Sequence, residues 1–168
     1  MDRDGEMREF VSARGPALSR AAYLLTGNRD AAEDLVQETY VVMVRQWRRI
    51  DSSNPEPYVR RIMYSRFVDG WRRRRLVEFP TATPSEAADP VDESGRVVDR
   101  LTLGQALMLL TPRQRAVLVL RFYEDLTEVQ VADALGVSTS TVKSQARVAL
   151  QRLRDLAPAA VGMREVTE

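Results

Sequence analysis

Four carboxylates gather in one short stretch of the chain, and their spacing limits the chemistry they could perform. Asp30, Asp34 and Glu38 recur every four residues, so on a helix they would share one face. Such a face could meet a basic partner, could ligate a metal ion, or could simply be solvated. The metal reading is disfavoured because the chain has no histidine and no second acidic helix. With no cysteine either, thiol catalysis, disulfides and thiolate zinc sites are excluded.

Arginines are concentrated in the next part of the chain. Residues 45–75 contain ten arginines against three acids. A basic block of this length could bind a polyanion such as a nucleic acid, although an arginine-rich face can also be merely solvated. The neighbouring stretches are acidic, with four acids against one arginine in residues 28–44 and six against two in residues 76–100. The net charge of +1 therefore conceals separate surfaces, which favours separate partners.

Residues 128–145 have the pattern of a helix-turn-helix. Ala132 is small where two helices would cross, and Gly136 tolerates the positive φ of a sharp turn. Val142 then falls where the second helix must bury an aliphatic side chain, and Ser138 can cap that helix. An ordinary helical hairpin with a glycine turn is the alternative at this point. The side chains expected to face a DNA major groove are short, polar or basic, namely Thr139, Ser140, Thr141, Lys143, Ser144, Gln145 and Arg147.

Helical periodicity predicts three helices that would carry the first two features. The first ends at Thr26-Gly27-Asn28, and the second is expected to start at Asp30 with Glu33 as a capping-box partner. The third is expected from about Tyr58 to about Arg75, with Phe67 and Trp71 turned more toward the core than toward a ligand.

A second helical unit is predicted over residues 101–156. Thr111, Pro112 and Gln114 fit the N-cap, first helical position and capping-box return of one of its helices, and Phe122 is expected to help form that helix's buried face. The intervening residues 76–100 are acidic and proline-rich, so they are interpreted as a linker long enough, at about 80 Å when extended, that the two units need not touch. The predicted fold class is all-α: two small helical domains joined by a flexible acidic linker, the C-terminal one a helix-turn-helix.

Taken together, the two halves resemble the extracytoplasmic-function, or group-four, sigma factors of bacterial RNA polymerase. The likeness rests on three segments: residues 30–40, residues 58–75, and residues 110–126 with the helix-turn-helix that follows them. The preference for arginine over lysine suggests a GC-rich genome and an actinobacterial member. The resemblance implies a region-two domain over residues 1–75, a linker over 76–100, a region-four domain over 101–157 and a tail over 158–168.

The resemblance also implies roles for individual residues. The minus-thirty-five element would be read as duplex by the seven side chains already named. Among the aromatic side chains of the third helix, Tyr58 and Tyr64 are expected to be exposed. The residues expected to bind polymerase are Asp30, Glu33, Asp34, Gln37 and Glu38. Those expected to contact the minus-ten element as single strand are Ser52, Ser53, Asn54, Tyr58, Arg60, Arg61, Tyr64, Arg66 and Trp71.

The function implied is that of a sigma factor, which binds core RNA polymerase and directs promoter-specific initiation without catalytic residues, cofactor or metal. An anti-sigma factor is a further expected partner. The charged N-terminus and the lack of a long apolar run predict a cytoplasmic protein with no membrane insertion. Two alternatives stay open: a helix-turn-helix repressor or activator that works without polymerase, and, less favoured, a metal-dependent nuclease using the carboxylates of residues 30–38.

Overall fold

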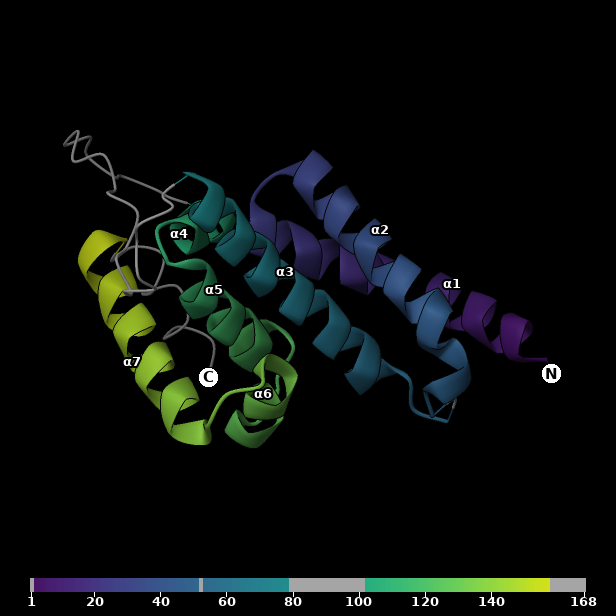
Figure 1. Ribbon diagram of the computed structural model, residues 1–168. Coiled ribbons are helices and arrows are strands. Elements are labelled where there is room, and N and C mark those ends of the chain that lie inside the picture. Colours follow the sequence, from purple (N-terminus) through teal and green to yellow (C-terminus); the bar gives the residue numbers. More distant parts are fainter. Residues whose placement is uncertain (1, 52, 79–101, 158–168) are drawn as a thin grey trace.

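The computed structural model describes residues 2–51, 53–78 and 102–157, and every regular element in those ranges is helical (Figure 1). This agrees with the predicted all-α class. Most of the predicted linker and the tail lie outside the described residues. In chain order, the elements are α1 (Arg3–Thr26), α2 (Arg29–Gln46), the 3-10 turn η1 (Trp47–Arg49), α3 (Glu56–Glu78), α4 (Leu103–Met108), α5 (Pro112–Leu118), the π-helical turn η2 (Val119–Tyr123), α6 (Glu128–Leu135) and α7 (Thr139–Leu156).

The first helical unit packs α2 against both α1 and α3. Its interior is apolar, with Leu25, Met43 and Met63 almost fully buried. The start predicted for α2 was wrong by one residue: the helix begins at Arg29, and the side chain of Asn28 caps it by accepting a hydrogen bond from the backbone N–H of Ala31. Asparagine is among the best N-caps, which leaves the nearby carboxylates outside the cap.

The second unit contains the predicted capping box. The hydroxyl of Thr111 accepts a hydrogen bond from the backbone N–H of Gln114, and the side-chain oxygen of Gln114 accepts one from the backbone N–H of Thr111. Pro112 lies in the first turn of the helix. The prediction that Phe122 is buried was wrong, because its side chain is 41% exposed. A π-helical turn follows α5, and the extra residue in that turn shifts the later side chains around the helix axis.

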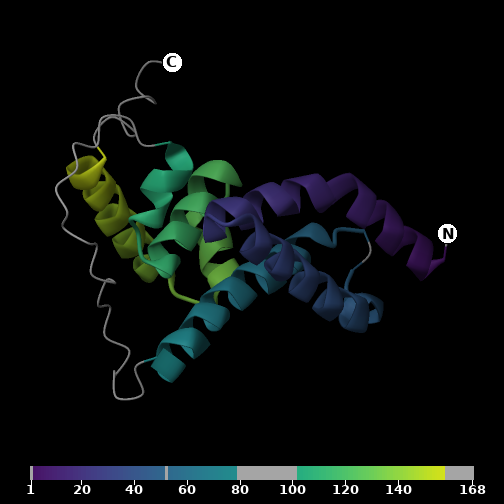
Figure 2. The same cartoon turned by 90° about the horizontal axis from the view of Figure 1, so that it is seen from above.

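The two units lie against each other, although the length of the linker did not require it. Helix α3 runs along their boundary, where α5 and α6 pack on it, while α4 and η2 approach α1 (Figures 1 and 2). The buried residues of both units form one continuous apolar cluster. Among the described residues no helix is both long enough and apolar enough to span a membrane.

Two glycines with left-handed backbone lead to a stability prediction. Gly27 ends α1 at φ +65° and Gly136 ends α6 at φ +64°, where a side chain costs about 1–2 kcal/mol. A Cβ on Gly136 would meet nothing within 4 Å, whereas one on Gly27 would lie 2.5 Å from Sδ of Met108. We therefore expect Gly136→Ala to lower the free energy of unfolding by about 1 kcal/mol and Gly27→Ala to lower it further, since Met108 must move.

Gly70 supplies the matched control, because it lies inside α3 with open space around the Cβ position. Gly70→Ala should raise the free energy of unfolding by roughly 0.5–1 kcal/mol through helix propensity. Urea unfolding followed by circular dichroism measures all three variants. Equal losses at Gly70 and Gly136 would contradict the backbone argument.

Candidate functional site

The acidic residues of α2 form one exposed face, as the spacing predicted. Asp30, Glu33, Asp34, Gln37 and Glu38 are all exposed, whereas the opposite side of the helix is buried against α1 and α3. On this face Glu33 forms an ion pair with Arg29, one turn earlier in the same helix, at 3.1 Å. A like-charged surface of this kind is tolerated in water, and it is suited to a basic partner.

The C-terminal end of this face carries two exposed apolar residues, Val41 and Val44, which were not predicted from the sequence. Val41 and Val44, one and two helical turns beyond Gln37, are 48% and 55% exposed. Beta-branched apolar side chains in the open on a helix that otherwise buries its apolar stripe are a feature of contact surfaces. The signal was present in the sequence, since Gln37, Val41 and Val44 continue the spacing of the acids.

The loop before α3 is organised by Asp51. Its Oδ1 accepts hydrogen bonds from the backbone N–H and the hydroxyl of Ser53, at 2.9 and 2.7 Å. These bonds lower the pKa of the Asp51 carboxyl below its ordinary value. Ser53 and Asn54 are both exposed, while Ser52 lies outside the described residues.

Helix α3 presents part of the predicted nucleic-acid surface and conceals another part. Tyr58 is 39% exposed, and its hydroxyl donates to Oε1 of Gln46. Arg66 and Trp71 are half-buried, and Phe67 is buried in the core as expected. The exposed basic side chains of the helix with described positions are Arg61, Arg72, Arg73 and Arg74.

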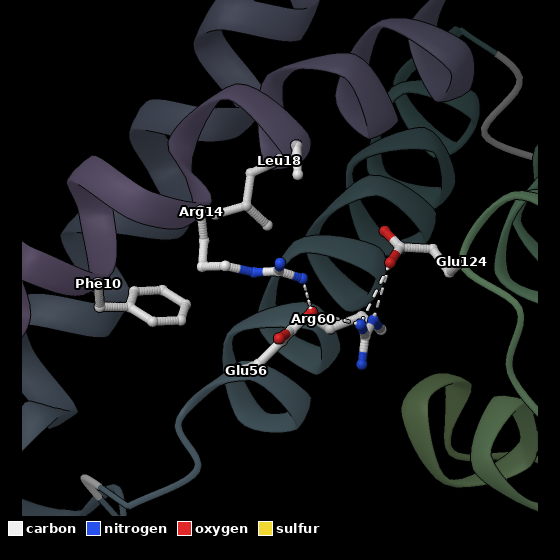
Figure 3. A pocket seen from close by; sticks show the side chains of 7 residues that line it. Phe10, Arg14, Leu18, Glu56, Arg60 and Glu124 are labelled. Atoms are coloured by element: carbon white, nitrogen blue, oxygen red, sulfur yellow. Dashed lines mark hydrogen bonds and ion pairs between the residues drawn. The ribbon is translucent and has the colours of Figure 1, made fainter.

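The expectation that Tyr64 is exposed was wrong. Its side chain is fully buried, and its hydroxyl donates to Oε1 of Glu124 at 3.4 Å. Burial, and then the negative charge of Glu124, raise the pKa of Tyr64 well above its ordinary value. Arg60 donates to the same carboxylate and to Glu56, so both residues of α3 are engaged with the chain itself (Figure 3).

The helix-turn-helix forms as predicted. Ala132 and Val142 are buried, and Gly136 adopts the left-handed conformation between α6 and α7. The hydroxyl of Ser138 caps α7 by accepting from the N–H of Thr141 at 3.2 Å. The small residue, the glycine turn, the N-cap and the buried valine therefore all stabilise the same pair of helices.

The outer face of α7 carries the side chains predicted for a major groove. Lys143 Nζ lies 3.7 Å from Oε2 of Glu128, and Arg147 is exposed on the next turn. Of the remaining five, Thr139, Ser140 and Ser144 are exposed, whereas Thr141 and Gln145 are half-buried. The structure thus brings this set together on one helix, separate from the acidic face of α2 (Figure 1). In the ranges that the structure describes, no group of three or more acidic side chains is placed to hold a metal ion.

Comparison with known proteins assigns both halves of the chain. Residues 10–77 match the model of Sigma-70 region 2, and residues 106–155 match that of Sigma-70, region 4. The RNA polymerase sigma-E factor of Streptomyces avermitilis is 38% identical over 152 residues, which cover 89% of this chain and 84% of that protein. The ECF RNA polymerase sigma factor SigL of Mycobacterium tuberculosis is 31% identical over 157 residues, covering 88% and 86% of the two chains.

A solved structure has a similar fold. The sigma factor RpoE from Bartonella quintana, crystallised in complex with the anti-sigma factor NepR, superposes with a TM-score of 0.67 at 24% identity, over 89% of this chain and 95% of that one. The two family matches lie in the same order as the two helical units, and the relatives cover nearly all of the chain. The chain therefore belongs to the extracytoplasmic-function sigma factors of the sigma-70 family.

Proposed function

We propose that this sigma factor binds core RNA polymerase through the exposed acidic face of α2 and its apolar end at Val41 and Val44. The observation that carries the proposal is that five acidic and amide side chains share one solvent-facing surface with two exposed valines. Surfaces that combine a charged part with exposed apolar side chains are typical of protein–protein contact, where charge steers the encounter and apolar burial retains the partner.

Promoter recognition is divided between the two units in this proposal. The face of α7 from Thr139 to Arg147 would read duplex DNA at the minus-thirty-five element. The loop at Ser53 and Asn54, with Tyr58 and the arginines of α3, would hold unstacked bases of the minus-ten element. Capture of those bases favours strand separation, because the cost of unstacking is offset by stacking and phosphate contacts.

No reaction is assigned to the chain itself. It would act on promoter DNA in the cytoplasm and leave phosphoryl transfer to the polymerase. The solved structure of the Bartonella relative contains an anti-sigma factor. We propose that a protein of that kind restrains this chain as well, and that residues 1–75 and 101–157 are the two domains it would contact.

Reconstitution tests this function. Purified chain is mixed with core RNA polymerase and a pool of genomic promoter fragments, and transcripts are mapped. We expect a stable complex and transcripts from discrete start sites that core polymerase alone does not use. A chain that stays apart from core polymerase but binds duplex DNA as a dimer would overturn the proposal in favour of a polymerase-independent repressor or activator.

A further inference from the structure

The end of η1, the turn that continues α2, is closed by a side chain from the start of α1. Nη1 of Arg3 donates hydrogen bonds to the backbone carbonyls of Trp47 and Ile50, at 3.2 and 3.3 Å. Both accepting residues are buried, and the start of α1 lies at the same end of the molecule as η1 (Figures 1 and 2). The last carbonyls of a helix have no partner within that helix, so an arginine from elsewhere in the chain is well suited to satisfy them.

The first turn of α1 does not by itself favour an arginine. A positive charge there faces the positive end of the helix dipole, which is unfavourable. The side chain of Asp2 already caps α1 by accepting from the backbone N–H of Gly5 at 2.7 Å. Asp4 and Glu6 supply the negative charges that a first turn prefers. The hydrogen bonds to η1 are therefore the interaction that stabilises Arg3 in this place.

The loop that joins η1 to α3 begins at the residue after Ile50. Oδ1 of Asp51 accepts from the backbone N–H and the hydroxyl of Ser53, and the carbonyl of Asp51 accepts from the backbone N–H of Asn54 at 3.2 Å. The bonds from Ser53 are the main reason that the pKa of the Asp51 carboxyl is lowered, and the positive charge of Arg3 lowers it further. Arg3 therefore acts on this loop in two ways, through the backbone of η1 and through the charge of Asp51.

Asn54 is the side chain of this loop that is best placed to meet a base. The hydroxyl of Ser53 is engaged by Asp51, whereas Asn54 is exposed and its side-chain amide makes no hydrogen bond to another described residue. An amide offers both a donor and an acceptor, which the edge of a base can match. Because Pro55 disfavours helical backbone at Asn54, the residues before Asn54 decide where this amide is held.

We propose that Arg3 is a positioning residue for base recognition: from the first turn of α1 it fixes the end of η1 and, through Asp51, the conformation in which Asn54 is presented to a minus-ten base. The inference rests on the proposed function of this loop. Loss of the guanidinium removes a donor from two carbonyls and a positive charge from beside Asp51, which frees the loop to adopt other conformations. Arg3 itself does not touch the DNA in this proposal.

Binding of single-stranded DNA to the reconstituted holoenzyme tests the proposal. The probe is an oligonucleotide with the non-template minus-ten sequence mapped in the reconstitution, compared with a series in which each base is replaced singly. We expect Arg3→Ala to reduce discrimination at one base position by about three- to tenfold, and Asn54→Ala to reduce it at the same position. Arg3→Lys should keep most of the discrimination, since an ammonium can donate to the same carbonyls. Arg8→Ala removes an exposed arginine further along α1 and, as the matched control, should keep the parent discrimination.

A second measurement follows the loop in the free chain, without polymerase or DNA. In amide NMR spectra of isotope-labelled protein, Arg3→Ala should shift the resonances of Ser53 and Asn54, whereas Arg8→Ala should leave them in place. Loop resonances that do not move in an Arg3→Ala chain of native helix content would overturn the proposal. Equal weakening of every minus-ten sequence, with a salt slope smaller by about one, would also overturn it, because that is the signature of an arginine that contacts a phosphate.

The two measurements separate this inference from the function on which it rests. If the loop resonances move as expected but the chain never binds core polymerase, the proposed function fails and the contact between Arg3 and the loop stands. If the holoenzyme forms and initiates but Arg3→Ala keeps the parent discrimination, the positioning role fails and the proposed function stands.

Discussion

The Asp34→Arg variant should lose at least about a hundredfold in affinity for core RNA polymerase, the largest effect that the structure predicts. Asp34 lies in the middle of the exposed face of α2, between Asp30 and Glu38. Reversal of its charge turns an attraction toward a basic surface into repulsion, and a like-charge contact across an interface costs several kcal/mol. Gln37→Ala should have a smaller effect of about tenfold or less, because only hydrogen bonds and contact area are removed.

Glu9→Arg is the matched control for this prediction. Glu9 is an exposed acid of α1, outside the proposed contact, and its reversal changes the net charge equally. Fluorescence anisotropy of labelled chain titrated with core polymerase measures all three affinities. Equal losses for Glu9→Arg and Asp34→Arg would mean that overall charge, not the α2 face, governs binding.

The apolar end of the face can be tested in the same assay. Val41→Asp introduces a charge where Val41 is 48% exposed, so the fold of the free chain should tolerate it. We expect binding to weaken by about tenfold or more, because burial of the valine is lost and a charge is desolvated. Parent-like affinity would restrict the contact to the acidic half of the helix.

The second large effect is expected at Arg147, on the outer face of α7. Arg147→Ala should weaken binding of the reconstituted holoenzyme to its minus-thirty-five duplex by about tenfold, as loss of an arginine contact to a base or phosphate costs roughly 1–3 kcal/mol. The exposed position of the side chain means that the substitution leaves the core of the helix pair intact.

Salt dependence separates the two roles that Arg147 could have. If it contacts a phosphate, the slope of log affinity against log salt should fall by about one in magnitude, and all promoter sequences should be weakened alike. If it reads a base, the loss should be confined to promoters that carry that base. Arg8→Ala, which removes one exposed positive charge from α1, serves as the control and should leave both quantities unchanged. An Arg147→Ala holoenzyme with parent affinity at every salt concentration would exclude α7 from duplex contact at this position.

Much of the candidate site could be predicted from sequence because its determinants are local. The helix-turn-helix depends on residues within twenty positions of one another: a small residue, a glycine and an aliphatic one at set spacing, with Ser138 as cap. The acidic face follows from helical periodicity alone, since residues four apart share a side whatever they pack against. The capping box at Thr111 is equally local.

Two local features were predicted wrongly, because more than one local conformation was compatible with the sequence at each of them. Asn28 and Asp30 are both suitable N-cap residues for α2, and in the structure Asn28 is the N-cap. At Phe122, the helical period predicted burial, but a π-helical turn added one residue and turned the ring outward. Nothing in the spacing of the apolar residues marks such a turn.

Local residue patterns therefore sufficed to predict the class of the protein: all-helical, with an acidic helix, an arginine-rich aromatic helix and a helix-turn-helix in that order. Which of those side chains are exposed to a partner depends instead on contacts between residues far apart in the chain. Tyr64 and Arg60 meet Glu124 across 60 and 64 residues of chain, and Arg115 reaches Leu25 across 90. Helical spacing places a side chain on a face but says nothing of what will cover that face. That depends on how two helical units of complementary charge and apolar surface fit together, which is a property of the folded chain as a whole.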